Sequence, residues 1–247
     1  MRFLPDIIVA WPKHVDYPLW RKQIHDNRHR FGKVIIVFTD MNAGGDYRNF
    51  IQDQMKQDNI IFCDNDPVRA GDDWRNLAVN KGLGYSDSQW VWFTEQDFYM
   101  YKPDEFWQGI EDCLETGADV IGYMQGGVRL HPCCIFIRRF VLDNFTRKDF
   151  GVVPDKHDHF YLLEEDLINA PDEVDVFRIT EAAKMDWFEH LNGLSQNIHM
   201  LQSGDEPNYD VEKFTTYVKT CVSIVDTFPM PSDMLELFTR YVERRTR

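Results

Sequence analysis

Short, continuously apolar runs alternate with segments of helical periodicity along the first half of the chain. The runs are DIIVAW, KVIIVFTD, NIIFC, QWVWFT and DVIGYM, at residues 6–11, 33–40, 59–63, 89–94 and 119–124. Short runs without polar alternation are typical of strands that are covered on both faces. Between them, apolar residues at helical spacing predict helices that begin near 16–18 and cover 46–58, 73–84 and 104–116. This alternation predicts an α/β fold with a mainly parallel central sheet flanked by helices.

Carboxylates follow the second and fourth of these strands. Asp40 ends one run, and Glu95 and Asp97 follow the other in the sequence WVWFTEQDFYM. Because ligands of parallel sheets bind at the carboxyl ends of the strands, we expect the three acids to face one crevice. Glu95 and Asp97 point the same way in an extended segment, and Mg²⁺ and Mn²⁺ prefer oxygen ligands. A metal ion shared with a diphosphate is the functional interpretation, and a solvated loop is the structural alternative.

A second acidic cluster and a single histidine are further candidates. Glu164, Glu165 and Asp166 follow the aromatic stretch HFYLL. A carboxylate beside apolar rings is desolvated enough to act as a general base, whereas acids favoured at a helix N-terminus are an equally good explanation. His190 lies in DWFEHLNGLSQN, where it is a candidate metal ligand, although a lone histidine is more often structural.

The second half of the chain is less regular and ends in helical periodicity. A strand is expected over 131–139 and a helix is expected to open within 157–167. A narrow helical seam then follows 3-4-3-4-3 spacing, and Ser232 is a suitable cap for a second helix. We expect a catalytic domain over 1–205 and a helical hairpin over 206–247 that packs on it, with a homodimer through the hairpin as the alternative. The seam residues are Val211, Phe214, Val218, Cys221, Val225 and Phe228.

The net charge of −14 argues against broad binding to a phosphate backbone, although arginines cluster in the tail TRYVERRTR and at Arg138 and Arg139. Five cysteines without CxxC spacing predict reduced thiols. The apolar stretch at the N-terminus is too short for a signal peptide, and no run approaches the roughly 20 apolar residues of a membrane span. We therefore expect a cytoplasmic protein.

Taken in order, these segments resemble the GT-A class of nucleotide-sugar glycosyltransferases, in particular its large family of inverting enzymes. The stretch WRNLAVNKGLGYSDSQWVWFTEQDFYM, residues 74–100, is similar to that family's Arg/Asn helix, its N-x-G-L turn and its strand ending in a DxD metal motif. YLLEEDL at 161–167 is similar to the segment with the catalytic base, and EHLNGLSQN at 189–197 to the later segment with a histidine. The resemblance covers roughly residues 5–200 and implies the GT-A fold with a C-terminal helical hairpin.

The resemblance also implies roles. A Mn²⁺ or Mg²⁺ ion would bind Asp97, with Glu95 and His190 as further ligands. Asp166, or Glu165 in its place, would be the base for an inverting transfer from a nucleotide-diphosphate sugar. The donor would contact four residues, Asp40, Trp11, Arg75 and Glu95. The chain departs from the family because its motif reads Glu-Gln-Asp, so Glu95 contacts either metal or ribose.

Several alternatives stay open. A hexosyl and a pentosyl transferase fit equally, and the acceptor is a glycan, a lipid carrier or a hydroxylated nucleobase. A nucleotidyltransferase is a second enzyme class, but the segment AWPKHVDYP after the first strand lacks the glycine-rich loop that cradles a triphosphate. A non-catalytic sugar-binding module of similar fold is the third class. The presence of acids at all three expected positions argues against it.

Overall fold

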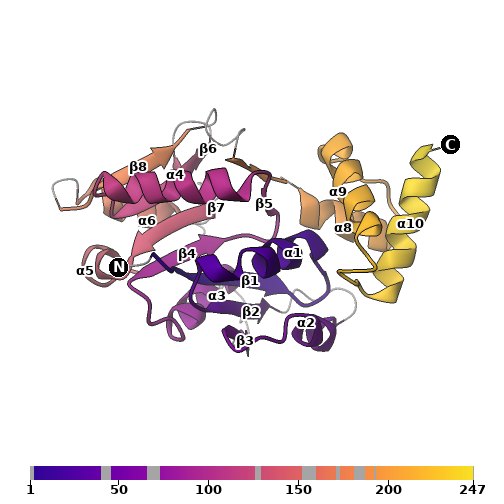
Figure 1. Ribbon diagram of the computed structural model, residues 1–247, viewed down its shortest axis with the longest axis horizontal. Coiled ribbons are helices and arrows are strands. Elements are labelled where there is room, and N and C mark those ends of the chain that lie inside the picture. The colour runs from indigo at the N-terminus through magenta and orange to yellow at the C-terminus, as the bar shows by residue number, and fades with distance from the viewer. Residues whose placement is uncertain are drawn as a thin grey trace.

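The computed structural model describes residues 3–39, 46–65, 73–125, 129–151, 160–170, 173–180, 187–191 and 193–246. Within these ranges a seven-stranded sheet has the order β3-β2-β1-β4-β7-β6-β8 and forms the centre of the molecule (Figure 1). Asp40 lies outside the described residues. The strands are β1 (Asp6–Pro12), β2 (Val34–Thr39), β3 (Ile60–Asp64), β4 (Trp90–Thr94), β6 (Val120–Gln125), β7 (Arg129–Arg138) and β8 (Val176–Ile179).

The sheet is mainly parallel, as its apolar runs predict. β1 pairs in parallel with β2 and β4, β2 with β3, and β6 with β8. β7 is the exception, because it lies antiparallel between β4 and β6. The connection from β6 to β7 is too short for the crossover that a parallel pair needs, so the chain turns back as a hairpin. This reversal brings the start of β7 to the carboxyl end of β4.

Helices cover both faces of the sheet. Along β1, Ile7 and Val9 enter one core while Ile8 enters the other, as the period of two along a strand requires. The first core packs α1 (Pro18–Asp26), α2 (Arg48–Gln54), α4 (Pro103–Glu115), α8 (Leu194–Ser203), α9 (Val211–Ser223) and α10 (Ser232–Thr246). The second core packs α3 (Trp74–Leu83), α5 (Arg139–Phe145) and α6 (Tyr161–Ile168).

Helix α3 packs unusually close to the sheet. The expected N-x-G-L turn forms the last turn of this helix, and a Cβ added to Gly82 would lie 2.5 Å from Cγ2 of Ile8 in β1. Only glycine permits this approach. The helix therefore lies directly on the strands whose ends form the candidate site.

The C-terminal helices pack against α1 at the end of the molecule opposite β8 (Figure 1). Phe214, Val218 and Cys221 of the predicted seam are buried in the same core as Trp20. The domain boundary at 205 and the homodimer stay predictions. Within the described ranges, no helix combines the length and the apolar character that a membrane span requires.

A buried arginine of α1, held in an ion pair beside the helix, also bonds to the segment before α10. Arg21 donates from Nε and from a terminal nitrogen to the two carboxylate oxygens of Asp16, both at 2.8 Å. The same guanidinium donates to the carbonyl of Pro229 at 2.5 Å. Burial raises the pKa of Asp16, while the charge of Arg21 acts in the opposite direction. The pair thereby fixes the C-terminal helices on the first helix.

Candidate active site

The acidic pair after β4 lies beside a small second sheet. β5 (Phe98–Met100) follows Asp97 directly and pairs antiparallel with β9 (Phe188–His190). The backbone N–H of Leu191 donates to the carbonyl of Asp97 at 2.8 Å. This pairing brings His190 to Asp97, although the two residues are far apart in the sequence.

Glu95, Asp97 and His190 form one cluster. Nε2 of His190 lies 3.2 Å from Oδ2 of Asp97 and 3.5 Å from Oε2 of Glu95. One ligand atom from each of the three residues lies within 4.8 Å of the others. The structure therefore brings together all three residues that the sequence predicts as metal ligands.

The cluster fits a hard divalent cation. Asp97 is only 17 % exposed, and its Oδ1 is buried without a hydrogen-bond partner among the described residues. A buried carboxylate oxygen of this kind is costly unless another group binds it. Two carboxylates and an imidazole are ligands that Mn²⁺ accepts, and Mg²⁺ accepts the carboxylates.

His131 and Cys133 of β7 lie next to this cluster, and sequence reasoning missed both. The rings of His131 and His190 are 4.5 Å apart, and Nδ1 of His131 lies 3.9 Å from Glu95. His131, Cys133 and His190 form a second group whose ligand atoms lie within 4.8 Å of one another. The only sequence signal was a histidine at the start of the expected strand over 131–139, and that signal does not reveal the antiparallel position of the strand.

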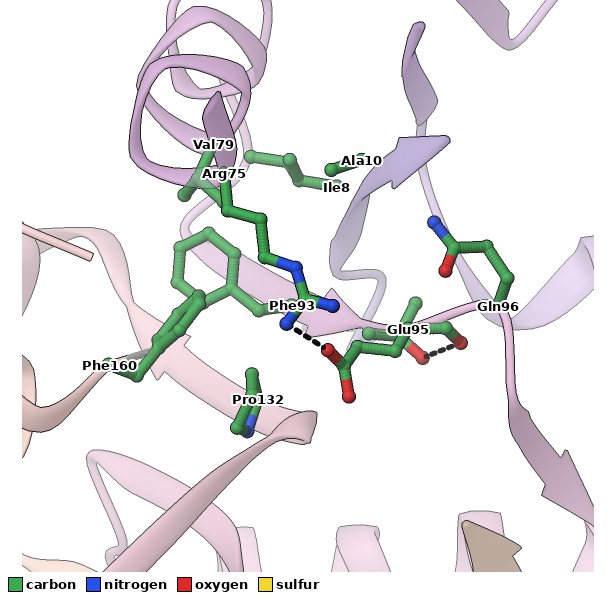
Figure 2. A pocket seen from close by; sticks show the side chains of 10 residues that line it. Ile8, Ala10, Arg75, Val79, Phe93, Glu95, Gln96, Pro132 and Phe160 are labelled. Atoms are coloured by element: carbon green, nitrogen blue, oxygen red, sulfur yellow. Dashed lines mark hydrogen bonds and ion pairs between the residues drawn. The ribbon is translucent and has the colours of Figure 1, made fainter. Parts of the chain in front are cut away.

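Arg75 holds the other side of Glu95. Asp73 caps helix α3 by accepting from the backbone N–H groups of Arg75 at 2.9 Å and Asn76 at 3.2 Å. The cap fixes the first turn of the helix, from which Arg75 reaches Glu95 with an N–O distance of 2.9 Å (Figure 2). One oxygen of Glu95 thus faces a guanidinium and the other faces His190.

A small cavity of about 30 Å³ adjoins this ion pair. It opens at the ends of β1 and β4, where ligands of parallel sheets bind. Figure 2 shows Phe93 and Phe160 along one side and the Arg75–Glu95 pair beside them. The cavity thus combines apolar walls with a charged rim. Its lining residues are Ile8, Ala10, Arg75, Val79, Phe93, Thr94, Glu95, Gln96, Pro132 and Phe160.

Trp11, one of the four residues expected to contact the donor, lies in the core instead. Its side chain is fully buried, and its indole N–H donates to the carbonyl of Val15 at 2.9 Å. The ring packs edge-on against Tyr17 and Trp20. The prediction is therefore corrected, because no face of this ring is available to a ligand.

Tyr17 is a second residue that the sequence did not single out. Its hydroxyl lies 2.7 Å from the hydroxyl of Ser195 at the start of α8. Burial raises the pKa of this phenol far above its usual range, and the charges of Asp97 and Glu95 act in the same direction, whereas the hydrogen bond with Ser195 opposes them. Tyr17 is therefore a neutral hydroxyl close to the acidic cluster.

The two acids predicted as catalytic base have a different partner. Arg147 donates from its side chain to Asp166 at 2.7 Å and from its backbone N–H to the same carboxylate at 2.8 Å. The guanidinium also contacts Glu165 at 2.5 Å. Neither acid lines the cavity beside Glu95, whereas Phe160, just before α6, does. Glu164 points inward and accepts from the backbone N–H of Leu130 at 3.1 Å.

The sequence matches no protein-family model, and no curated protein gives a significant match. Solved structures do match. TarS of S. aureus aligns with a TM-score of 0.50 at 12 % identity, over 98 % of this chain and 43 % of TarS. This chain therefore spans less than half the length of TarS. A mannosyltransferase of Pyrobaculum calidifontis, solved with GDP-Man and Mn²⁺, aligns with a TM-score of 0.51 at 11 % identity, over 97 % of this chain and 69 % of that one.

A third structure is glucosyl-3-phosphoglycerate synthase of Mycobacterium tuberculosis, solved with Mn²⁺, UDP-Glc and glycerol 3-phosphate. It aligns with a TM-score of 0.51 at 12 % identity, over 93 % of this chain and 82 % of the synthase. The chain has the GT-A fold. The GT-A architecture expected from the order of the motifs is thus confirmed, while identities this low show the fold alone.

Proposed function

We propose that this GT-A chain is a metal-dependent glycosyltransferase that transfers a sugar from a nucleotide-diphosphate sugar to an acceptor hydroxyl. One observation carries the proposal. Glu95, Asp97 and His190 converge at the carboxyl end of β4, and the buried Oδ1 of Asp97 has no hydrogen-bond partner among the described residues. The mannosyltransferase and the synthase of the same fold were solved with Mn²⁺ and a nucleotide sugar, which supports the same class of reaction here.

Asp97 and His190 would hold Mn²⁺ or Mg²⁺, with Glu95 beside them. When bound, the ion would supply Lewis-acid neutralisation of the charge that develops on the departing diphosphate. Glu95 is shared between Arg75 and His190, so we assign it to positioning these two groups as well as to the ion. Its longer side chain, where the family has aspartate, suits this bridging position.

The remaining donor contacts come from the charged rim of the cavity. Arg75 is placed to meet a phosphate or the ribose, whereas the cavity itself, at about 30 Å³, is far below the roughly 300–1,000 Å³ of a ligand site and does not enclose the nucleoside. Asp40 remains the sequence-predicted contact to the nucleoside. The five cysteines are free thiols, which fits a reducing compartment, and we keep the cytoplasm as the proposed location.

We further propose that transfer inverts the anomeric centre. The acceptor oxygen forms a bond to the anomeric carbon from the face opposite the diphosphate, and the bond to the diphosphate oxygen breaks with its electron pair. The acceptor proton passes to a base. Asp166, or Glu165, remains the sequence prediction for this base. Its pairing with Arg147 favours a structural role instead, and the transfer rate of Asp166→Asn decides between the two roles.

A thermal-shift screen tests the proposal. Hexose and pentose sugars activated with uridine or guanosine diphosphate are compared with Mn²⁺ present and after chelation. We expect one of them to raise Tm by about 5 °C or more near 100 times its Kd, only with the metal. Asp97→Ala should lose this effect. Equal stabilisation without metal, or in the variant, contradicts the metal site, and no stabilisation by any donor favours a non-catalytic module.

A further inference from the structure

A second cavity lies away from Arg75, between the small β5–β9 sheet and helix α9. Its volume is about 430 Å³, within the range of roughly 300–1,000 Å³ that is typical of small-molecule sites. Tyr99, Tyr101 and Glu189 line it from the small sheet, and Asp210 and Lys213 line it from α9 and the residue before it.

The cavity and the acidic cluster are built on the same two strands. Asp97 directly precedes β5, which carries Tyr99, and His190 is the last residue of β9, which carries Glu189. Tyr99 pairs with Glu189 in the antiparallel register, one position from the pair of Phe98 with His190. Because side chains alternate along a strand, Tyr99 and Glu189 point to the face opposite Phe98 and His190. The link from the cavity to the metal ligands is Leu191, which lines the cavity and donates its backbone N–H to the carbonyl of Asp97.

The lining combines aromatic faces with hydrogen-bonding groups. The rings of Tyr99 and Tyr101 lie 5.6 Å apart and nearly perpendicular to each other. Lys213 bridges Glu189 at 2.6 Å and Asp210 at 3.2 Å, and Tyr101 donates to Glu189. Aromatic faces cover the C–H faces of a sugar ring, while carboxylates accept hydrogen bonds from its hydroxyls.

The charge of the cavity distinguishes between kinds of acceptor. Its described lining holds three carboxylates, from Glu189, Asp210 and Glu212, against the single ammonium of Lys213. The hydrogen bond to Glu189 raises the pKa of Lys213, and this lysine is already shared between two of the acids. Like charges repel, so the cavity disfavours a phosphate group and with it a nucleic-acid strand or a phosphorylated acceptor.

We propose that this cavity binds the acceptor, and that the acceptor is a neutral sugar ring. The proposal rests on the proposed transferase function and assigns a role to the C-terminal helices, because α9 supplies one wall of the acceptor site. The acceptor hydroxyl would extend past Leu191 toward Asp97, while Tyr99 and Tyr101 hold the ring.

Saturation-transfer NMR with small probes tests this assignment. The probes are the methyl glycosides of glucose, galactose and mannose, with glucose 6-phosphate and a duplex containing hydroxymethylated cytosine as anionic competitors. We expect at least one neutral glycoside to bind, and to bind tighter than either anion. Tyr101→Ala should weaken its binding about fivefold through the loss of one aromatic contact. Thr216→Trp, at an exposed position of α9 that lines the cavity, should block it.

Tyr85→Ala is the matched control, because Tyr85 is similarly exposed but lies after α3, outside the cavity lining. The assignment is wrong if no neutral glycoside binds, if both cavity variants bind like the wild type, or if an anionic probe binds tighter. Donor stabilisation with Mn²⁺ is measured on the same samples. If the glycoside binds but no donor stabilises the protein with Mn²⁺, the transferase function is contradicted and the sugar-binding cavity is not. If a donor stabilises the protein but no glycoside binds, the acceptor site alone is contradicted.

Discussion

The acids after β4 and the acids on α6 differ in what surrounds them. The side chains of Asp97 and Glu95 are 17 % and 16 % exposed, and both lie close to His190. One carboxylate oxygen of Asp97 has no hydrogen-bond partner among the described residues. Asp166 is buried at least as deeply, at 11 % exposed, but both of its carboxylate oxygens accept hydrogen bonds from Arg147. In sequence both clusters look like pairs of functional acids. The difference teaches that a buried carboxylate becomes a candidate ligand when one of its oxygens is left without a hydrogen-bond partner, as in Asp97.

The largest effect is expected at Asp97. Asp97→Asn keeps the shape of the side chain but removes the charge that would bind the ion, so the affinity for Mn²⁺ should fall about 100-fold or more. Calorimetric titration of Mn²⁺ measures the change. Asp166→Asn is the matched variant from the other cluster and should bind Mn²⁺ within about twofold of the wild type. Equal losses in both variants would remove the contrast between the clusters.

The second-largest effect on Mn²⁺ affinity is expected at His131. Its ring packs against His190 and faces Glu95, so it orients two predicted ligands. His131→Asn should lower the affinity for Mn²⁺ about 10- to 100-fold, as loss of a residue that orients metal ligands does. His199→Asn, an exposed histidine on α8, is the control and should change nothing. An unchanged Mn²⁺ affinity in His131→Asn would show that the metal site consists only of the ligands predicted from the sequence.

A smaller effect is expected for transfer in Asp166→Asn. Since both carboxylate oxygens already accept from Arg147, we expect the rate of sugar transfer to fall less than about tenfold, below the contribution of a general base. Initial rates with the donor identified in the thermal-shift screen measure this. A loss of 100-fold or more with unchanged donor binding would establish Asp166 as the base despite its ion pair.

The smallest effect concerns Tyr17. Tyr17→Phe removes the hydrogen bond to Ser195 and should lower the free energy of unfolding by about 1 kcal/mol. Urea unfolding measures it. Ser195→Ala should cost a similar amount, and the double variant should cost less than the sum, because both remove one contact. Additive losses would show that the two hydroxyls act independently.

The sequence predicts the parts of this molecule that depend on local pattern. β1, β2 and β4 are covered on both faces and are therefore apolar except at one terminal residue each, which made them visible. Glu95 and Asp97 follow such a strand directly, so their placement needed no tertiary information. The helical seam that begins at Val211 was visible because its apolar residues recur at helical spacing on one face.

The parts that escaped prediction depend on pairing between distant segments. β5 and β9 have three residues each, too few for a periodic signal, yet they bring His190 to Asp97. His131 joins the cluster only because β7 runs antiparallel beside β4. Trp11 shows the converse error, since a position near a strand end does not reveal that neighbouring aromatic rings enclose the side chain.

The bond from Arg21 to the carbonyl of Pro229 has a consequence for synthesis of the chain. The two residues are 208 positions apart, so the guanidinium leaves the ribosome long before its acceptor exists. Until then α1 also lacks the buried residues of α9 and α10 that share its hydrophobic core. Helix α1 can therefore complete its packing only after residue 229 and helices α9 and α10 have emerged, so the packing of this face is a late step of folding.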